Sequence, residues 1–312
     1  MMKPSIKLRA AALLAVTTLL AGGAAAAASW TSSAAAAGKP GAGKPTVTIG
    51  DKNFTEENIL GSLYAQALRA QGYNVVEKDN IGSSEIIWKA LVAGQIGLYP
   101  EYTGTLLTAV ANQTTNPTSA AQAYSEAKAF VEKHGFTLLD DTPFYDSDVL
   151  ITKPSYAAKY HLKTVGDLAK LGKKVRLGAA PEFATRFEGL IGLKKDYGVN
   201  PTFVPLAIGL DYNALDSGQI DVADAFTTDG QLAHGAYTLL SDPKGVFGYQ
   251  NVAPVVSKTL LAKEGPDFAA TLNRVDALLT NTAVRALNYA VTIDKLQPAA
   301  VAAKFLQANH LT

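Results

Sequence analysis

Apolar residues follow two periods along this chain, short strand-length runs and longer stretches with helical spacing. Residues 47–50 form a strand-length run. They are followed by a helical pattern that ends at Gly72, in which Ile59, Leu60 and Leu63 recur on one face. The same order of strand and helix recurs through most of the chain. The alternation predicts an α/β fold.

One copy of this pattern ends in a polar aromatic loop. Gly94 lies where the end of a helix needs a left-handed residue. Residues 96–99 are an apolar run of strand length, and we expect Pro100 to end the strand because proline has no N–H to donate. Tyr102 and Thr105 then follow at the carboxyl end of a strand, where open α/β sheets bind ligands.

The same pattern recurs 124 residues further on, and a second echo relates residues 47–54 to residues 175–183. Two echoes in the same order indicate a repeated α/β lobe, although helix, glycine and strand also follow one another in many α/β proteins. Two like lobes facing each other would form a cleft with an aromatic residue from each copy. The residues that match at the offset of 124 are Ala90, Leu91, Gly94, Gln95, Ile96, Leu98, Tyr102 and Thr103, with Ala214, Leu215, Gly218, Gln219, Ile220, Val222, Phe226 and Thr227.

The repeat suggests the domain boundaries. We predict a first lobe from residues 46–147 and 252–312, and a second lobe from residues 148–251. A chain that enters the second lobe and returns has two connecting segments, which is the geometry of a hinge.

The amino terminus has the features of an export signal. Residues 1–28 contain a basic front, a short apolar middle and small residues at 24–28. The apolar part is too short to span a bilayer comfortably, and an uncleaved anchor is the alternative. Residues 29–45 are rich in Ser, Ala, Gly, Lys and Pro, and we expect a flexible leader there.

Charge and cysteine content narrow the function. The chain has 28 Lys and Arg against 27 Asp and Glu, and three of the basic residues lie in the export signal. This near balance gives no electrostatic footprint for nucleic acid. The absence of cysteine excludes disulfides, thiol catalysis and a diacylglyceryl-cysteine anchor. A free protein beyond the inner membrane, most simply in a periplasm, fits best.

Signatures of enzymes are scarce. The four histidines are scattered without the spacing of a metal site. The nucleophile elbow, the phosphate-binding loop and the dinucleotide glycine fingerprint are absent from the sequence. We therefore predict no catalysis, no metal and no cofactor.

Aromatic residues in loops are the main candidates for binding. Tyr102, Phe226 and Tyr249 each lie next to a predicted strand. Ring faces attract a weakly hydrated cation, and a quaternary ammonium group suits them because it has no N–H to satisfy. The alternative for each ring is ordinary packing. Arg186 can bind a carboxylate with two parallel hydrogen bonds, or it forms a surface ion pair with Glu182 or Glu188.

Six motifs stand out along the chain, residues 49–56 (IGDKNFTE), 81–85 (IGSSE), 98–105 (LYPEYTGT), 181–186 (PEFATR), 227–229 (TTD) and 285–288 (RALN). Together they resemble the substrate-binding proteins of osmoprotectant (glycine betaine, choline and carnitine) ABC importers. The resemblance covers about residues 46–310. It implies a two-lobe type II periplasmic-binding-protein fold, with an interlobe cleft and a two-segment hinge, that closes around its ligand.

The resemblance also implies roles for single residues. Tyr102 matches a tyrosine of an aromatic cage, Thr105 its companion, and Tyr249 another cage position. Arg186 matches the arginine that binds the ligand's carboxylate. Lys52 matches an auxiliary position in the first loop.

Three further positions complete the comparison with the family. Asp146 matches the acidic residue of the hinge loop. Phe226 replaces a common tyrosine, which keeps the ring face and loses the hydroxyl. Asp148 stands where another cage aromatic is expected. A carboxylate there would attract a cation by charge and accept N–H donors, unless it faces solvent and only caps the strand.

The sequence thus predicts an extracytoplasmic, monomeric binding protein without catalytic activity. It would bind a quaternary amine or betaine-type osmolyte in an aromatic cage and deliver it to an ABC permease in the inner membrane. Carnitine, choline, a larger betaine such as ergothioneine, a non-methylated amine or an amino acid remain open as ligands. A sensing protein that signals to a membrane partner is a further alternative.

Overall fold

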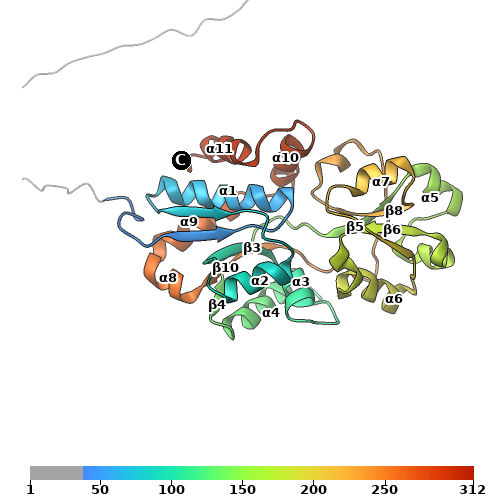
Figure 1. Cartoon of the computed structure of the whole chain (residues 1–312), viewed down its shortest axis with the longest axis horizontal. Helices are drawn as coiled ribbons and strands as arrows, with labels where there is room; N and C mark the ends of the chain where they lie inside the picture. Colours follow the sequence, from blue (N-terminus) through green and yellow to red (C-terminus); the bar gives the residue numbers. More distant parts are fainter. Residues whose placement is uncertain (1–37) are drawn as a thin grey trace, which may run out of the picture. The chain divides into compact units, whose positions relative to one another are not determined.

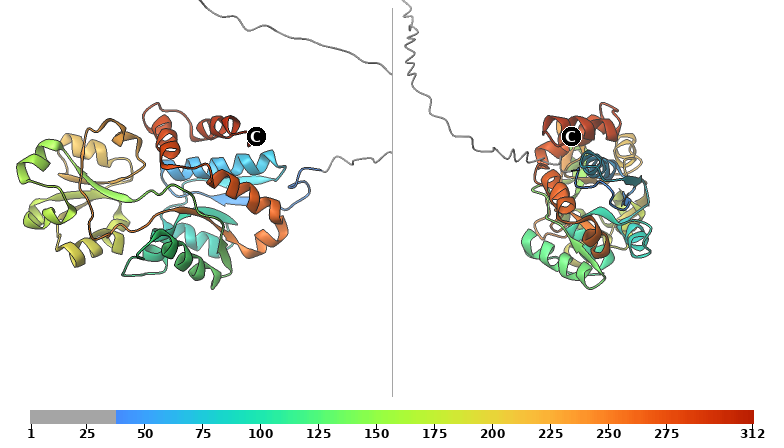
Figure 2. Two further views of the ribbon diagram at one scale, coloured as in Figure 1. Left: turned by 180° about the vertical axis from the view of Figure 1, so that it is seen from behind. Right: turned by 90° about the vertical axis from the view of Figure 1, so that its left-hand side faces the viewer.

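Residues 38–312 of the chain are described by a computed structural model (Figure 1). The predicted export signal and residues 29–37 of the predicted leader lie outside this range. Residues 38–312 form two α/β lobes, and each lobe contains a five-stranded sheet. The strands of the second sheet all come from the middle of the chain (Figure 2).

The first lobe combines the first part of the described chain with its end. Its sheet has the order β2-β1-β3-β10-β4, in which β1 runs parallel to β2 and β3, and β10 runs antiparallel to β3 and β4. Apolar residues form a core on each face of this sheet. The elements are β1 (Val47–Gly50), α1 (Thr55–Ala70), β2 (Val75–Lys78), α2 (Ser84–Val92), β3 (Leu98–Tyr102), α3 (Thr103–Thr105), α4 (Ala120–Glu132), β4 (Phe136–Leu138), β10 (Val252–Ser257), α8 (Lys258–Glu264), α9 (Pro266–Asp276), α10 (Asn281–Thr292) and α11 (Pro298–Ala308).

The second lobe repeats this plan on a smaller scale. Its sheet has the order β7-β6-β8-β5-β9, with β6 parallel to β7 and β8, and β5 antiparallel to β8 and β9. It also has a core on each face. The elements are β5 (Asp148–Thr152), α5 (Pro154–Tyr160), β6 (Arg176–Ala179), α6 (Gly192–Tyr197), β7 (Thr202–Pro205), α7 (Asp211–Ser217), β8 (Val222–Phe226) and β9 (Thr238–Leu239).

The repeat seen in the sequence extends to the packing of single residues. β3 and β8 occupy the same place in their sheets, and their first residues are 124 positions apart. A Cβ added to Gly50 would lie 2.6 Å from Cδ1 of Ile96, and one added to Gly178 would lie 2.6 Å from Cδ1 of Ile220. In each lobe, therefore, a glycine on the first strand of the lobe, β1 or β6, makes room for the isoleucine before β3 or β8.

The prediction that Pro100 ends its strand is wrong. β3 continues through Pro100 to Tyr102, and Pro100 lies opposite Pro254 of β10. The Thr103 N–H donates to the carbonyl of Asn251. Because hydrogen-bonded pairs alternate along an antiparallel ladder, the two prolines fall at a pair that exchanges no N–H bonds. Proline is therefore tolerated inside this strand.

Two segments connect the lobes, one after β4 and one before β10. They touch each other, because Tyr145 forms a β-bridge with Asn251 and the Asp146 N–H donates to the carbonyl of Gln250. The Asn251 amide also donates to the carbonyls of Thr142 and Phe144. Paired connecting strands of this kind form a two-segment hinge.

The end of the predicted leader is held against the first lobe. The Gly41 N–H donates to the carbonyl of Gln71, and Lys44 Nζ lies 3.0 Å from the carbonyl oxygen of Lys263. A Cβ on Gly41 would lie 2.3 Å from the backbone nitrogen of Tyr73, so a larger residue would disturb this contact.

No helix between residues 38 and 312 is long and apolar enough to cross a membrane. In the same residues, no group of His, Cys, Asp and Glu is arranged to hold a metal ion.

Asp51, directly after β1, is a buried acid without a hydrogen-bond partner. Its side chain is 1% exposed, and neither carboxyl oxygen is paired. Gly61 of α1 makes room for it, since a Cβ there would lie 1.9 Å from Asp51 Oδ1. Burial, followed by the charge of Glu57, raises the pKa of Asp51 from 3.8 to about 9. The folded protein therefore holds this carboxyl in its neutral form at neutral pH.

Asp51 should make the protein less stable as pH rises. In the unfolded chain its pKa is 3.8, so between that value and about 9 the folded state binds the extra proton. The free energy of unfolding should fall across this window, by up to about 1.4 kcal/mol per pH unit. The stabilisation is complete below the unfolded pKa and is lost as pH rises through the folded pKa.

Thermal unfolding between pH 5 and pH 9 would test this. Asp51→Asn cannot ionise, so its melting temperature should fall less steeply with pH than that of the wild type. Asp294→Asn, at an exposed position, is the control and should keep the wild-type slope. Equal slopes for wild type and Asp51→Asn would contradict the assignment.

Candidate functional site

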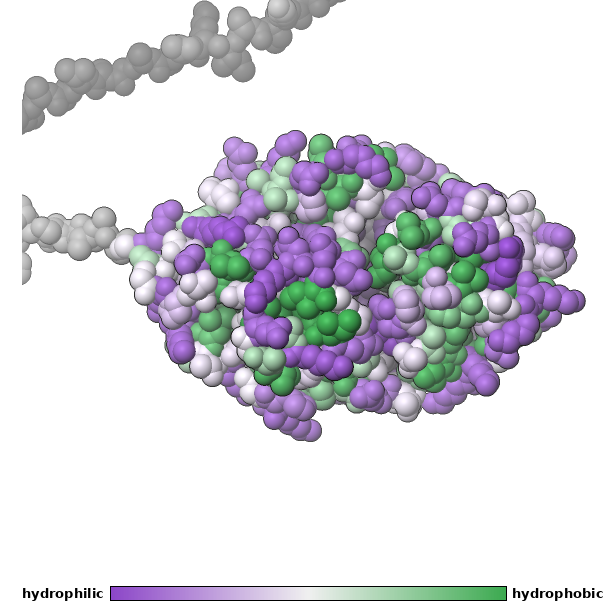
Figure 3. All heavy atoms as spheres, viewed as in Figure 1, coloured by the Kyte–Doolittle hydropathy of each residue, from purple (hydrophilic) through white to green (hydrophobic). Residues whose placement is uncertain are grey.

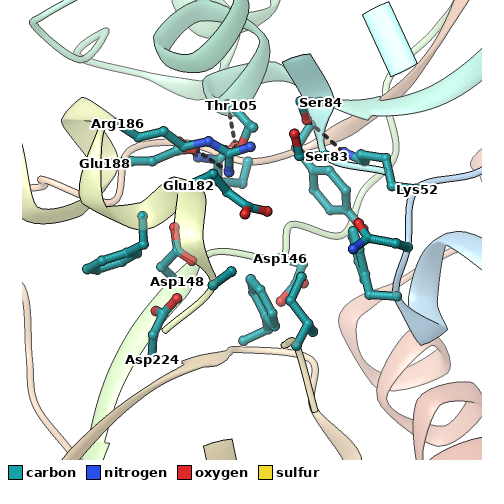
Figure 4. Close-up of a pocket in the computed structure, with 18 residues that line it drawn as sticks. Lys52, Ser83, Ser84, Thr105, Asp146, Asp148, Glu182, Arg186, Glu188 and Asp224 are labelled. Atoms are coloured by element: carbon teal, nitrogen blue, oxygen red, sulfur yellow. Dashed lines mark hydrogen bonds and ion pairs between the residues drawn. The ribbon is translucent and has the colours of Figure 1, made fainter. Parts of the chain in front are cut away.

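A pocket lies between the two lobes, where β1 and β3 end opposite β6 and β8 (Figure 4). Its volume is about 60 Å³. Figure 3 shows one face of the molecule. Polar residues predominate on this face, and apolar residues gather beside the hollow between the lobes. Four aromatic residues line the pocket, Phe54 and Tyr102 from the first lobe, and Phe183 and Phe226 from the second.

Three of these rings form a connected group. The Phe54 ring stacks on Phe226 across the cleft, with centroids 5.9 Å apart and an interplanar angle of 14°. Its centroid lies 6.0 Å from that of Tyr102. Tyr102 and Phe226 are the last residues of β3 and β8. The strand ends of both lobes thus bring ring faces to one place.

Lys52 lies at the base of this group. Its Nζ is 4.3 Å from the centroid of the Tyr102 ring and 2.6 Å from Glu101 Oε1. It also lies 3.6 Å from Glu57 Oε1. The side chain lines the pocket and is 3% exposed. Lys52 therefore already has carboxylate partners, and its charge is balanced inside the first lobe.

Glu56 joins both lobes behind the rings. Its Oε1 accepts from the Tyr102 hydroxyl at 2.6 Å, and its Oε2 accepts from the Thr228 hydroxyl at 2.6 Å and from Asn288 Nδ2 at 2.7 Å. Burial raises the pKa of Glu56, and these three hydrogen bonds lower it in part. The Tyr102 hydroxyl is thus used to hold the ring in position.

Asp146 lies in the first connecting segment and at the edge of the pocket. Its Oδ1 accepts from the backbone N–H of Thr228 at 3.0 Å and from the Thr227 hydroxyl at 3.2 Å. Burial, followed by the charges of Glu56 and Asp229, raises its pKa well above the usual range. Asp146 therefore fixes the loop after β8 to the hinge.

Arg186 spans the cleft to a residue that the sequence analysis did not select. Its Nε and Nη2 donate to the two carboxylate oxygens of Glu85, on α2, at 3.0 and 2.9 Å. Its Nη1 lies 3.5 Å from Glu188 Oε1. Burial alone would raise the pKa of Glu85, but the hydrogen bonds and charge of Arg186 outweigh it and lower the pKa to about 2. The guanidinium fork therefore holds a carboxylate of the protein.

A short turn sets the direction of Arg186. In the helical turn Phe187–Ile191, Gly189 has φ −125° and ψ −137°, so the chain bends there. A Cβ on Gly189 would lie 2.0 Å from the carbonyl oxygen of Phe183. Glycine permits this close approach, and the bend places Arg186 and Glu188 on the pocket wall.

Thr105 also contacts the opposite lobe. Its hydroxyl lies 3.3 Å from Glu188 Oε2 and 3.3 Å from Gln250 Oε1. Gln250 Nε2 donates to the same Glu188 oxygen at 2.9 Å. This network links the first lobe, the second connecting segment and the second lobe.

Asp148 lines the pocket, so the structure favours the cleft-facing alternative for this residue. Burial, followed by the charge of Glu188, raises its pKa well above the usual range, and the charge of Arg186 offsets part of this. Asp224 lies beside it on the pocket wall (Figure 4). The pocket is therefore acidic, and its charged lining residues are Lys52, Asp146, Asp148, Glu182, Arg186, Glu188 and Asp224.

The structure does not place Tyr249 with the other rings, and its role in a cage stays a prediction of the resemblance. Tyr249 is 41% exposed and lines a separate open groove. Its hydroxyl donates to the carbonyl of Thr118 at 3.1 Å. The preceding residue, Gly248, has φ +66°, so the backbone adopts a left-handed conformation where the chain turns toward this groove. The neighbouring Gln250 lines the pocket instead.

Sequence reasoning missed Phe54, Glu85, Glu188 and Asp224. A signal for Phe54 was present, because the second echo pairs it with Phe183 and both rings line the pocket. Glu188 was considered only as a surface partner of Arg186, yet it is 2% exposed. Nothing in the pattern distinguished Glu85 or Asp224 from other acidic residues.

Comparisons with known proteins agree on one family. The family described as "Substrate binding domain of ABC-type glycine betaine transport system" matches residues 45–308. A glycine-betaine-binding protein of Pseudomonas aeruginosa is 33% identical, over 85% of this chain and 88% of that protein. The carnitine transport binding protein OpuCC of Listeria monocytogenes is 28% identical, over 88% of this chain and 90% of its own length.

A solved structure gives the same result for the fold. It is a glycine betaine/carnitine/choline ABC transporter protein with 30% sequence identity and a TM-score of 0.67. The match covers 85% of this chain and 99% of that one.

The Arg186–Glu85 pair should hold the lobes together before any ligand arrives. Hydrogen bonds to a charged group contribute about 1.5–3 kcal/mol, and partial exposure reduces this. In Glu85→Gln the charge is lost, so the ligand-free protein should spend more time open and show a larger radius of gyration in X-ray scattering.

A pair within one lobe provides the control. Glu77 pairs with Arg69 at 2.7 Å on the surface of the first lobe, so Glu77→Gln should leave the radius of gyration unchanged. If Glu85→Gln and the control give the same scattering as wild type, the pair does not govern closure.

Proposed function

This chain belongs to the family of substrate-binding domains of ABC-type glycine betaine transport systems, and we propose that its interlobe pocket captures a small cationic or zwitterionic amine, with quaternary-ammonium and betaine-type osmolytes as the class that the family suggests. Proteins of this family are non-catalytic and work outside the cytoplasm with an importer. The bound amine would be delivered to a permease in the inner membrane. We further propose that residues 1–28 direct export to the periplasm and that the protein works as a monomer.

The observation that carries this proposal is the meeting of aromatic rings from both lobes in one pocket. The centroid of the Phe54 ring lies 6.0 Å from that of Tyr102 and 5.9 Å from that of Phe226. Each ring face contributes about 0.5–2 kcal/mol to holding a desolvated cation. Lys52 Nζ already lies over the Tyr102 ring, so this environment accommodates positive charge.

The charge of the pocket supports a cationic guest. Lys52 and Arg186 are both paired with carboxylates of the protein. The pocket wall has five acidic residues against these two basic ones, so it favours a cation over an anion. Where burial raises the pKa of a carboxyl, as at Asp148 and Asp224, an arriving cation can take the place of the proton. A ligand carboxylate would reach Arg186 by taking the place of Glu85.

Binding and closure would be coupled. The proposed contacts come from the first lobe through Tyr102 and Thr105, and from the second lobe through Arg186 and Phe226. A ligand that touches both sides binds the closed state better and shifts the population toward it. The permease would then distinguish the loaded protein by its closed form.

A thermal-shift panel would test the proposed ligand class. The panel contains glycine betaine, choline, carnitine, proline betaine, ergothioneine and unmethylated amino acids. At 100 times its dissociation constant, a ligand should raise the free energy of unfolding by about 2.7 kcal/mol. At least one amine should produce such a shift. If no amine in the panel stabilises the protein, the proposal fails.

Variants of the rings would then locate the site. With the best ligand, Phe54→Ala and Phe226→Ala should each weaken binding by about 3- to 30-fold in calorimetry, since each removes one ring face. Tyr160→Ala is the matched control, because this ring packs on Tyr156 in the second lobe and does not line the pocket.

Tyr249→Ala distinguishes the structure from the resemblance. The structure predicts no loss of affinity, because Tyr249 faces another groove. A loss equal to that of Phe226→Ala would show that Tyr249 belongs to the cage and that the loop is drawn into the cleft on binding.

A further inference from the structure

Two carboxylates share one wall of the pocket with an aromatic ring. Asp148 lies opposite Phe226 in the antiparallel pair of β5 and β8, and Asp224 precedes Phe226 by two residues on β8. Residues two apart on a strand point to the same face. Both carboxylates therefore lie beside the Phe226 ring, and both line the pocket (Figure 4).

Asp224 is buried without a complete set of partners. The residue is 6% exposed, and no N–H or hydroxyl group of the described residues donates to its Oδ1. A buried polar atom without a partner costs the folded protein free energy. An oxygen of this kind that lines a ligand pocket can be satisfied when the guest supplies a donor.

Asp224 hydrogen-bonds to Asp148, another carboxyl group, so this bond exists only while one of the two carries a proton. Burial, followed by the charges of Asp148, Asp211, Asp229 and Glu188, raises its pKa well above the usual range. The two basic residues of the pocket are engaged elsewhere, Lys52 with Glu101 and Arg186 with Glu85. A cation with N–H groups that arrives with a ligand can take the place of the proton that Asp148 and Asp224 share.

A fully methylated nitrogen could supply positive charge beside Asp224 but not a hydrogen bond. A trimethylammonium group carries positive charge but has no N–H, so it cannot hydrogen-bond to Asp224 Oδ1. A primary or secondary ammonium, an amidinium or an imidazolium group has both the charge and the donors. A hydrogen bond between opposite charges is also stronger than one between neutral groups.

We propose that Asp148 and Asp224 form a recognition point for N–H donors, so that the preferred ligand is a small cation bearing N–H groups and not one whose only charged nitrogen is fully methylated. This proposal rests on the proposed function and makes it narrower. The rings would hold the apolar part of the cation, and the two carboxylates would hold its N–H groups. Asp148 and Asp224 are then the residues that determine specificity in this pocket.

Matched ligands that differ only in N-methylation would test the proposal. The pairs are ethanolamine with choline, glycine with glycine betaine, and 4-amino-3-hydroxybutyrate with carnitine. We would measure each by calorimetry on the wild-type protein. In at least one pair, the member with N–H groups should bind at least 10-fold more tightly than its methylated counterpart.

Variants then assign the preference to the two carboxylates. Asp224→Asn and Asp148→Asn should each reduce the ratio of the two affinities at least fivefold and change the affinity for the methylated member much less. Asp294→Asn, at an exposed position outside the pocket, is the charge control and should keep the wild-type ratio. Circular dichroism and the melting temperature would confirm that each variant folds. The comparison of ligand pairs on wild type stands without them.

The outcomes separate this inference from the proposed function. If the methylated members bind equally well or better in every pair, water fills the gap at Asp224, and the inference is wrong while the proposed function stands. A preference that survives unchanged in both variants also overturns it. If no ligand of any pair binds while another amine of the thermal-shift panel does, the inference is wrong and the proposed function stands. If nothing in either set binds, both fail.

Discussion

The closed cleft depends on an ion pair between its two walls. Arg186 from the second lobe donates two parallel hydrogen bonds to Glu85 of the first lobe, at 3.0 and 2.9 Å. The contact is partly exposed, with 16% of the Arg186 side chain and 31% of the Glu85 side chain accessible. It is therefore strong enough to orient the lobes and weak enough to open, because water competes for partly exposed charges. The stacking of Phe54 on Phe226 adds an apolar contact between the same two lobes.

The two lobes share one topology, and this explains why ligand-binding residues from both lobes lie at the cleft. Each sheet ends its first and third parallel strands at the cleft, so each lobe presents residues from the same two positions. Phe54 and Phe183 follow the first of these strands, and Tyr102 and Phe226 end the other. The lobes differ in their charges. The first buries Lys52 among carboxylates, whereas the second places Asp148 and Asp224 beside its ring. A symmetric frame thus yields a pocket with two chemically different walls.

Periodicity in the sequence predicts the elements well, because each lobe buries regular apolar faces. The glycine stops, the two echoes and the position of Tyr102 at a strand end all correspond to features of the structure. Pro100 could not be placed from its chemistry alone, because its tolerance depends on the register with Pro254. Tyr249 could not be placed because a left-handed glycine and a carbonyl 131 residues away in sequence determine its direction. The partner of Arg186 is likewise separated from it by 101 residues. Local patterns contain no information on such pairs.

A crystal structure of the protein with the amine that stabilises it most would test the central claim most directly. Our account predicts the cationic nitrogen between the lobes, within about 6 Å of the centroids of the Phe54 and Phe226 rings, with contacts from residues of both lobes. A ligand bound to one lobe alone, or in the open groove beside Tyr249, would contradict it.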